Sequence, residues 1–161
     1  MADDYATLLH DLAGEQASLL GAIASIDDDE WFTPTPAKGW DVRDVVSHLA
    51  DTDEIAIDTC TGGARPLNDF ALGLASPEDA TLWGVLRGRR MPGAEVRSWY
   101  ERTSRAEIDV LATLDQAMRV PWGLGMRPPS FVTARMMECW AHSLDVRDAL
   151  ALPAADTDRL R

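Results

Sequence analysis

Two residues that can bind a metal ion stand four positions apart near the C-terminal end of the chain. Glu138 and His142 lie within residues 133–150, a stretch with helical periodicity. Their spacing places both side chains on one face of a helix, about 40° apart around its axis. Asp145 follows one turn later on the same face, and apolar residues flank this polar stripe on both sides. Buried polar groups need partners, and a divalent metal ion suits both a carboxylate and an imidazole.

His48 is a third candidate ligand. It lies in a segment that begins at Asp41, a good helix N-cap, and ends at the glycines of positions 62 and 63. His48 stands at the edge of the apolar face of this predicted helix. The residues alone leave two interpretations open, because such a histidine is either a hydrogen-bonded core residue or a metal ligand.

Two imidazoles and one carboxylate would form the ligand set of a catalytic zinc site, in which the fourth position stays open. The same set suits non-haem Fe(II), so the ligands do not select the metal. Cys139 points about 100° away from Glu138 on its helix and does not complete a closed structural site. Asp145 has three interpretations: it orients His142, it touches the metal itself, or it pairs with an arginine.

Composition limits the classes of function. The chain has 161 residues, of which 46% are hydrophobic and 26% are charged, as expected for a single globular domain. The net charge of -12 argues against a nucleic-acid-binding surface. No apolar run approaches the roughly 20 residues of a membrane span, and no signal peptide is recognisable. We therefore expect a cytoplasmic protein whose two cysteines, Cys60 and Cys139, are free thiols.

The periodicity predicts an all-α fold with four main helices and a shorter fifth, and the strand signal is weak throughout. Asp3 and Asp4 are expected to cap a first helix that ends before the acidic run at 27–30. Residues 31–39 form a loop, and Pro66 should keep the segment after the second helix irregular. The third helix begins with the capping pattern of residues 76–79, and the fourth runs from residue 93 to about 114. A loop at 120–129 leads to a last helix that Ser130 should cap.

Three further features allow both a structural and a functional interpretation. Arg87, Arg89 and Arg90 are either a solvated helix end or a clamp for an anionic substrate. The loop at 120–129 either packs on the bundle or forms a wall of the site. Met136 and Trp140 project from the face opposite Glu138 and His142, where they could cover a second protomer, a further domain or a neighbouring helix.

Two motifs resemble a known family. Residues 39–50, GWDVRDVVSHLA, and residues 136–150, MMECWAHSLDVRDAL, resemble the N-terminal domain of mycothiol-dependent maleylpyruvate isomerase, a member of the DinB-like metal-binding four-helix bundles. The resemblance implies a DinB-like four-helix bundle that binds one divalent metal, commonly zinc. It implies the ligands His48, Glu138 and His142.

The resemblance also implies a domain boundary and a reaction. Residues 1–152 would form the bundle, and residues 153–161 would be a polar tail or the start of a second domain, which family members usually carry. The implied function is a thiol-dependent isomerase or S-transferase that uses mycothiol, a small sugar-linked thiol, as cosubstrate and acts on a small electrophile. Two alternatives stay open: a metal-dependent hydrolase with Asp145 or Asp51 as base, and a non-enzymatic, metal-stabilised binding module, for example in a homodimer.

Overall fold

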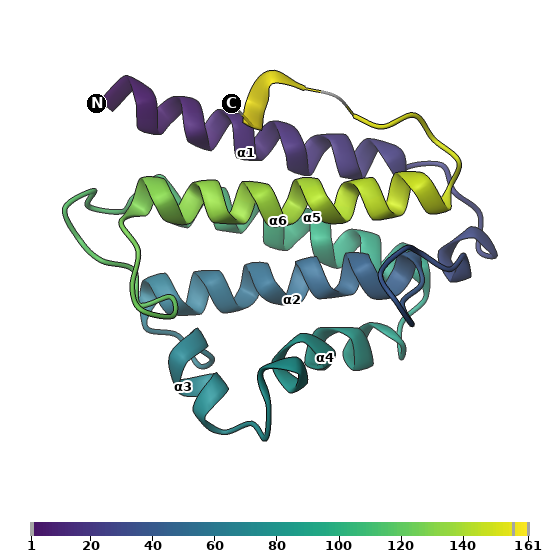
Figure 1. Cartoon of the computed structure of the whole chain (residues 1–161), viewed down its shortest axis with the longest axis horizontal. Coiled ribbons are helices and arrows are strands. Elements are labelled where there is room, and N and C mark those ends of the chain that lie inside the picture. Colours follow the sequence, from purple (N-terminus) through teal and green to yellow (C-terminus); the bar gives the residue numbers. More distant parts are fainter. Residues whose placement is uncertain (1, 156, 161) are drawn as a thin grey trace.

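Four long helices form the frame of the molecule (Figure 1). The computed structural model describes residues 2–155 and 157–160. The frame consists of α1 (Ala2–Ala22), α2 (Val42–Thr61), α5 (Gly93–Leu111) and α6 (Pro128–Ala149). Among the described residues there is no strand, only two isolated β-bridges. The predicted all-α bundle is therefore confirmed.

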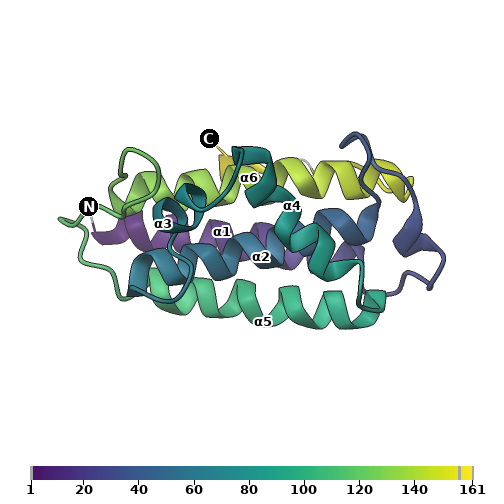
Figure 2. The same cartoon turned by 90° about the horizontal axis from the view of Figure 1, so that it is seen from below.

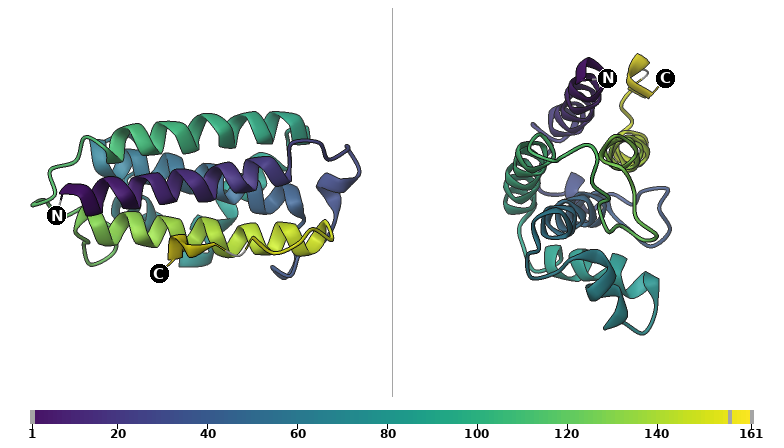
Figure 3. Two further views of the ribbon diagram at one scale, coloured as in Figure 1. Left: turned by 90° about the horizontal axis from the view of Figure 1, so that it is seen from above. Right: turned by 90° about the vertical axis from the view of Figure 1, so that its left-hand side faces the viewer.

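The four helices enclose one core. α1 packs against α5 and α6, and α2 packs against the same two helices (Figure 3). α1 and α6 run in one direction, and α2 and α5 run in the other (Figure 1). The connection from α2 to α5 contains α3 (Leu67–Leu72) and α4 (Pro77–Gly88), which lie outside the frame on α2 (Figure 2). No helix in the described ranges has the length and apolar character that a membrane span requires.

The ends of α2 follow the prediction. The Asp41 side chain accepts a hydrogen bond from the backbone N–H of Asp44, and the Asp44 carboxylate accepts the backbone N–H of Asp41 in return. Gly62 ends the helix in the left-handed region, with φ 73°. Ser76 and Asp79 form the same reciprocal cap at the start of α4.

Three boundaries differ from the prediction. α6 begins at Pro128, so Ser130 lies inside the helix and caps nothing. A proline in the first turn makes a side-chain cap dispensable there, because it has no N–H to satisfy. α1 already begins at Ala2, so the aspartates at positions 3 and 4 lie in its first turn. α5 ends at Leu111, about one turn before the predicted end.

The segment after Pro66 is helical, whereas the proline predicted an irregular chain. Pro66 precedes α3 with an extended backbone, and its carbonyl accepts the N–H of Phe70. Phe70 then packs edge-to-face on Trp83 of α4, with ring centroids 5.7 Å apart. This contact between helices is absent from local sequence patterns and stabilises the short helix.

The core has two apolar clusters, one at each end of the bundle. Trp31, from the short 3-10 helix Glu30–Phe32, is buried in the first cluster beside Gly93, where a Cβ atom would overlap the indole ring. Met136 is buried in the second cluster and Trp140 is half-buried. Met136 therefore packs against neighbouring helices of its own chain, which is one of the three interpretations given above for this face.

A layer of buried charges separates the two clusters. The Arg135 guanidinium donates from Nε to Glu107 at 2.7 Å and from an Nη atom to Asp53 at 2.8 Å. Gln16 donates to the second oxygen of Glu107 at 2.9 Å, and the Thr103 hydroxyl donates to Asp53 at 3.1 Å. These groups come from α1, α2, α5 and α6, so the layer fixes the register of all four helices.

α4 lies unusually close to α2. Cβ atoms added at Gly84 and Gly88 would overlap Asp51 and Ser47 of α2. Two glycines one turn apart thus let the backbones of the two helices approach each other. This contact places the N-terminal half of α4, with Thr81 and Leu82, over the middle of α2 (Figure 2).

Candidate metal centre

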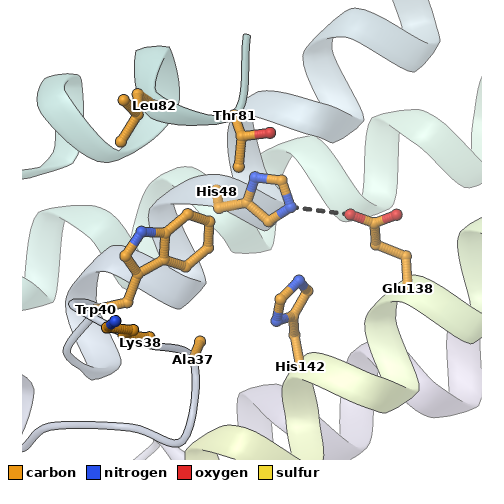
Figure 4. A pocket seen from close by; sticks show the side chains of 8 residues that line it. All are labelled: Ala37, Lys38, Trp40, His48, Thr81, Leu82, Glu138 and His142. Carbon is orange, nitrogen blue, oxygen red and sulfur yellow. Dashed lines mark hydrogen bonds and ion pairs between the residues drawn. The ribbon is translucent and has the colours of Figure 1, made fainter. Parts of the chain in front are cut away.

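His48, Glu138 and His142 converge between α2 and α6 (Figure 4). One potential ligand atom from each residue lies within 4.8 Å of the other two. The Nε2 atom of His48 lies 2.8 Å from Oε1 of Glu138, and the two imidazole centroids lie 5.1 Å apart at an interplanar angle of 75°. The structure therefore brings together all three ligands that the sequence and the family resemblance predicted.

The electrostatics of the site keep Glu138 ionised. Its hydrogen bond to His48 lowers the pKa of Glu138 to about 2, with Arg135 one turn earlier acting in the same direction and against the effect of burial. Burial, followed by the proximity of His48, lowers the pKa of His142. A carboxylate that stays ionised beside an imidazole that stays neutral is the protonation state in which both residues bind metals.

Asp145 contacts His142 directly. Its Oδ2 atom lies 3.1 Å from Nδ1 of His142, one turn along α6. With Nδ1 held by this carboxylate, Nε2 is the ring nitrogen that can serve as ligand. Asp145 is absent from the three-residue cluster of potential ligands. Of the three interpretations given above, the geometry supports an orienting role for Asp145.

The residues fit a divalent ion. A tetrahedral zinc site with bonds of about 2.0–2.1 Å holds its ligand atoms roughly 3.3 Å apart. The three side chains are partly exposed to solvent, with 10% for His48, 35% for Glu138 and 22% for His142. Small side-chain rotations are therefore enough to bring the donor atoms from the observed spacing to the required one.

A pocket of about 520 Å³ opens beside the three side chains (Figure 4). Trp40 forms one wall: its ring stacks on His142 with centroids 6.0 Å apart, and it meets His48 at a tilt with centroids 5.1 Å apart. Lys38, the only lysine of the chain, also lines the pocket, as do Thr81 and Leu82 of α4. Sequence reasoning missed these wall residues, since Trp40 reads as a packing residue and α4 reaches the site only through its contact with α2.

The arginine cluster does not border this pocket. Arg87 donates to Glu54 at 2.7 Å and lies over the Trp99 ring, and Arg89 forms a two-pronged pair with Asp44. Arg87 and Arg89 are therefore engaged by acidic and aromatic side chains of their own chain, away from the pocket beside His48. The loop at 120–129 does reach the site, because Trp122 lines a second pocket together with His48 and Glu138.

Neither carboxylate considered as a general base is available for that role. Asp51 accepts a hydrogen bond from Arg65 at 2.9 Å, its side chain is 3% exposed, and it borders neither pocket beside His48. Asp145 is engaged by His142. The site thus offers three candidate ligands with an open side, and the two carboxylates considered as a base both have partners within the chain.

The chain is thus an all-α bundle in which two histidines and one glutamate face a pocket and form a possible metal site. Residues 4–147 match the family described as the mycothiol maleylpyruvate isomerase N-terminal domain, and the chain belongs to this family. The predicted family is therefore confirmed.

The similar proteins with known sequence or structure are longer than this chain. Uncharacterized proteins of two Mycobacterium tuberculosis strains, H37Rv and CDC 1551, are each 32% identical over 159 residues, which is 98% of this chain and 62% of theirs. A crystal structure of the mycothiol-dependent maleylpyruvate isomerase superposes with a TM-score of 0.72 at 16% identity, covering 88% of this chain and 60% of that one. A histidine-to-alanine mutant of that isomerase matches equally well, at 15% identity. These two structures show the shared fold.

Proposed function

We propose that this protein is a zinc-dependent enzyme that uses a small thiol, mycothiol in the first instance. The enzyme would either isomerise a small electrophilic substrate or transfer the thiol to it. The observation that carries the proposal is the convergence of His48, Glu138 and His142 beside an open pocket. Membership of a family described by a mycothiol-dependent isomerisation supports the choice of thiol.

A divalent ion held by these three side chains would supply one open coordination position, at which a thiol binds as its thiolate. Glu138 and the neutral His142 are already in the protonation states that such an ion needs. Asp145 fixes the orientation of His142 through its Nδ1 atom. Trp40 and Leu82 contribute apolar surface beside the open position, against which the carbon skeleton of the electrophile would pack.

An isomerisation would proceed by addition of the sulfur to the electrophile, rotation and elimination of the sulfur. The thiol releases its proton to solvent, and the thiolate sulfur forms a bond to one carbon of a conjugated double bond. The electron pair of that double bond moves onto the conjugated carbonyl. Rotation about the resulting single bond follows, after which the carbon–sulfur bond breaks and the thiolate is regenerated. Transfer would end at the sulfur adduct instead, once the carbon next to the carbonyl takes a proton from solvent.

Two other functions fit the sequence less well once the geometry is known. A hydrolase needs a general base beside the attacking water, and the carboxylates considered for it are paired with Arg65 and His142. A non-enzymatic binding module has no need of a pocket that opens onto three potential ligands. Both functions are outcomes of the experiment below.

Cobalt substitution tests the proposal. Protein loaded with one Co²⁺ per chain is titrated with 2-mercaptoethanol and with mycothiol, and we expect an intense sulfur-to-cobalt charge-transfer band. His48→Ala should abolish the band, whereas His10→Ala should retain it, because His10 is exposed on α1 away from the site. A cobalt spectrum that neither thiol changes would refute the thiol mechanism and favour a hydrolase or a binding module.

A further inference from the structure

A second pocket borders His48 and Glu138 from another direction. It has a volume of about 390 Å³, and it shares His48, Thr81 and Glu138 with the pocket of about 520 Å³ described above. We call the larger pocket, which contains Lys38 and His142, the front lobe. The back lobe is the smaller pocket, and it extends towards α3 and the loop at 120–129. The His48–Glu138 pair thus lies where the two lobes meet.

The two lobes differ in charge. Besides His48 and Glu138, every residue that lines the back lobe is uncharged, and the wall combines apolar groups with hydroxyl and amide groups. The front lobe contains the ammonium group of Lys38 in addition. Away from the His48–Glu138 pair, a wall of apolar and hydrogen-bonding groups suits a hydroxylated ligand, because no charged group of that wall has to be desolvated when the ligand binds.

Hydrogen bonds hold the wall of the back lobe in place. The amide of Asn68 on α3 donates to the carbonyl of Gly123 at 3.1 Å, which ties α3 to the tip of the loop. The amide oxygen of Asn68 keeps its acceptor capacity for a ligand hydroxyl. The Thr52 hydroxyl donates to the His48 carbonyl at 2.7 Å, and its oxygen can accept a further hydrogen bond. The indole of Trp122 adds an apolar surface.

We propose that the back lobe binds the sugar-linked body of the thiol cosubstrate, while the electrophile enters through the front lobe. This inference rests on the proposed thiol-dependent function. The thiol sulfur and the electrophile have to meet beside the three ligands, so the body of the thiol and the electrophile need separate spaces. All three ligands border the front lobe, whereas His142 does not border the back lobe. The bond-forming space is therefore at the front, and the back lobe, with its hydrogen-bonding wall, takes the hydroxylated body of the thiol.

The test fills each lobe and compares two thiols on the cobalt-loaded protein. Ala71→Trp places a large side chain in the back lobe, and Leu82→Trp enlarges a side chain of the front lobe. We expect Ala71→Trp to weaken mycothiol binding about tenfold or more, the size of effect that overpacking produces. Binding of 2-mercaptoethanol should stay within about twofold of wild type, since it has no body to exclude. Leu72→Trp is the matched control, because Leu72 is the next residue of α3 and is 86% exposed.

Three results would overturn the inference while leaving the thiol mechanism intact. One is equal binding of mycothiol to wild type and Ala71→Trp. Another is an equal loss for both thiols in Ala71→Trp, which would indicate a disturbed metal centre. The third is a mycothiol-specific loss in Leu82→Trp alone, which would place the thiol body in the front lobe. A wild-type spectrum that neither thiol changes would instead refute the proposed function itself.

Discussion

Two clusters of ionisable side chains join α2 to α6, and they differ in the source of their positive charge. In the buried layer, Arg135 supplies a cation to Asp53 and Glu107, and its side chain is 3% exposed. In the candidate metal centre, Glu138 faces two imidazoles, and burial lowers the pKa of His142. The first cluster is complete within the chain, whereas the second has no permanent cation among its three members.

This difference in charge distinguishes the buried layer from the candidate metal centre, although the same helices carry both clusters. Burial raises the pKa of Asp53 well above its usual range, and Glu107 adds to that effect, so the layer depends on Arg135. Burial by itself would lower the pKa of Arg135, but the carboxylates of Glu107 and Asp53 outweigh burial and raise it above its usual value. An ion pair of this kind is closed to ligands. The centre with the open side is the one that a divalent cation can complete.

The largest effect should follow from removing the internal cation. Arg135→Met leaves Asp53 and Glu107 buried without their partner, and it should lower the free energy of unfolding by about 3–5 kcal/mol. Urea denaturation followed by circular dichroism measures the change. Arg105→Met is the control, with an expected change below about 0.5 kcal/mol, because Arg105 is 77% exposed and its pair with Glu101 lies on the surface. A loss below about 1 kcal/mol in Arg135→Met would show that the layer is dispensable.

Removing a ligand should affect metal binding far more than stability. His142→Ala leaves two protein ligands, and we expect the affinity for Zn²⁺ to fall more than about 100-fold, since loss of a ligand's supporting carboxylate alone costs 10–100-fold. Isothermal titration with a competing chelator measures the affinity. His10→Ala should bind Zn²⁺ as wild type does. Unchanged stoichiometry and affinity in His142→Ala would exclude this residue from the site.

A smaller effect on the affinity for Zn²⁺ is expected for Asp145, which contacts the proposed ligand His142. Asp145→Ala removes the acceptor at Nδ1 of His142, and the Zn²⁺ affinity should fall about 10–100-fold. Asp148→Ala is the control on the same helix, because its side chain is exposed and is not near the site. Equal affinities in the two variants would mean that Asp145 does not orient His142.

The smallest effect concerns the metal-free protein at low pH. Because the pKa of Glu138 is lowered from 4.5 to about 2, its contribution to stability is complete above pH 4.5 and disappears as the pH falls towards 2. Glu138→Gln in the presence of chelator should therefore lose less stability than wild type over this interval. Chemical denaturation at several pH values measures both slopes. Parallel slopes would show that the His48 contact has no energetic weight.

Local patterns were sufficient to predict most of the fold. The four-residue spacing of Glu138 and His142 and the reciprocal caps at Asp41 and Ser76 depend only on neighbouring residues, and the structure contains all of them. α3 was missed because its stability comes from the contact between Phe70 and Trp83, which no local pattern encodes. The start of α6 was misplaced because Pro128 begins the helix without a side-chain cap.

The site was predictable only in part, for a related reason. His48 lies 90 positions from Glu138 in the sequence, so periodicity left its role open, and only the family resemblance implied that it belongs with Glu138 and His142. Nothing in the local sequence around Trp40 indicates its stacking against His142, since that contact is formed between a loop and α6. Contacts between residues that are far apart in the sequence cannot be predicted from the pattern of a single segment.

The glycines of α4 have a consequence for the shape of the front lobe. Gly84 and Gly88 set the distance between α4 and α2, and α4 in turn carries Thr81 and Leu82 on the wall of that lobe. The width of the lobe is therefore controlled by residues that do not line it. A methyl group at either glycine would push the helix outward and widen the entrance, so the space offered to the proposed electrophile would change while the three candidate ligands stay as they are.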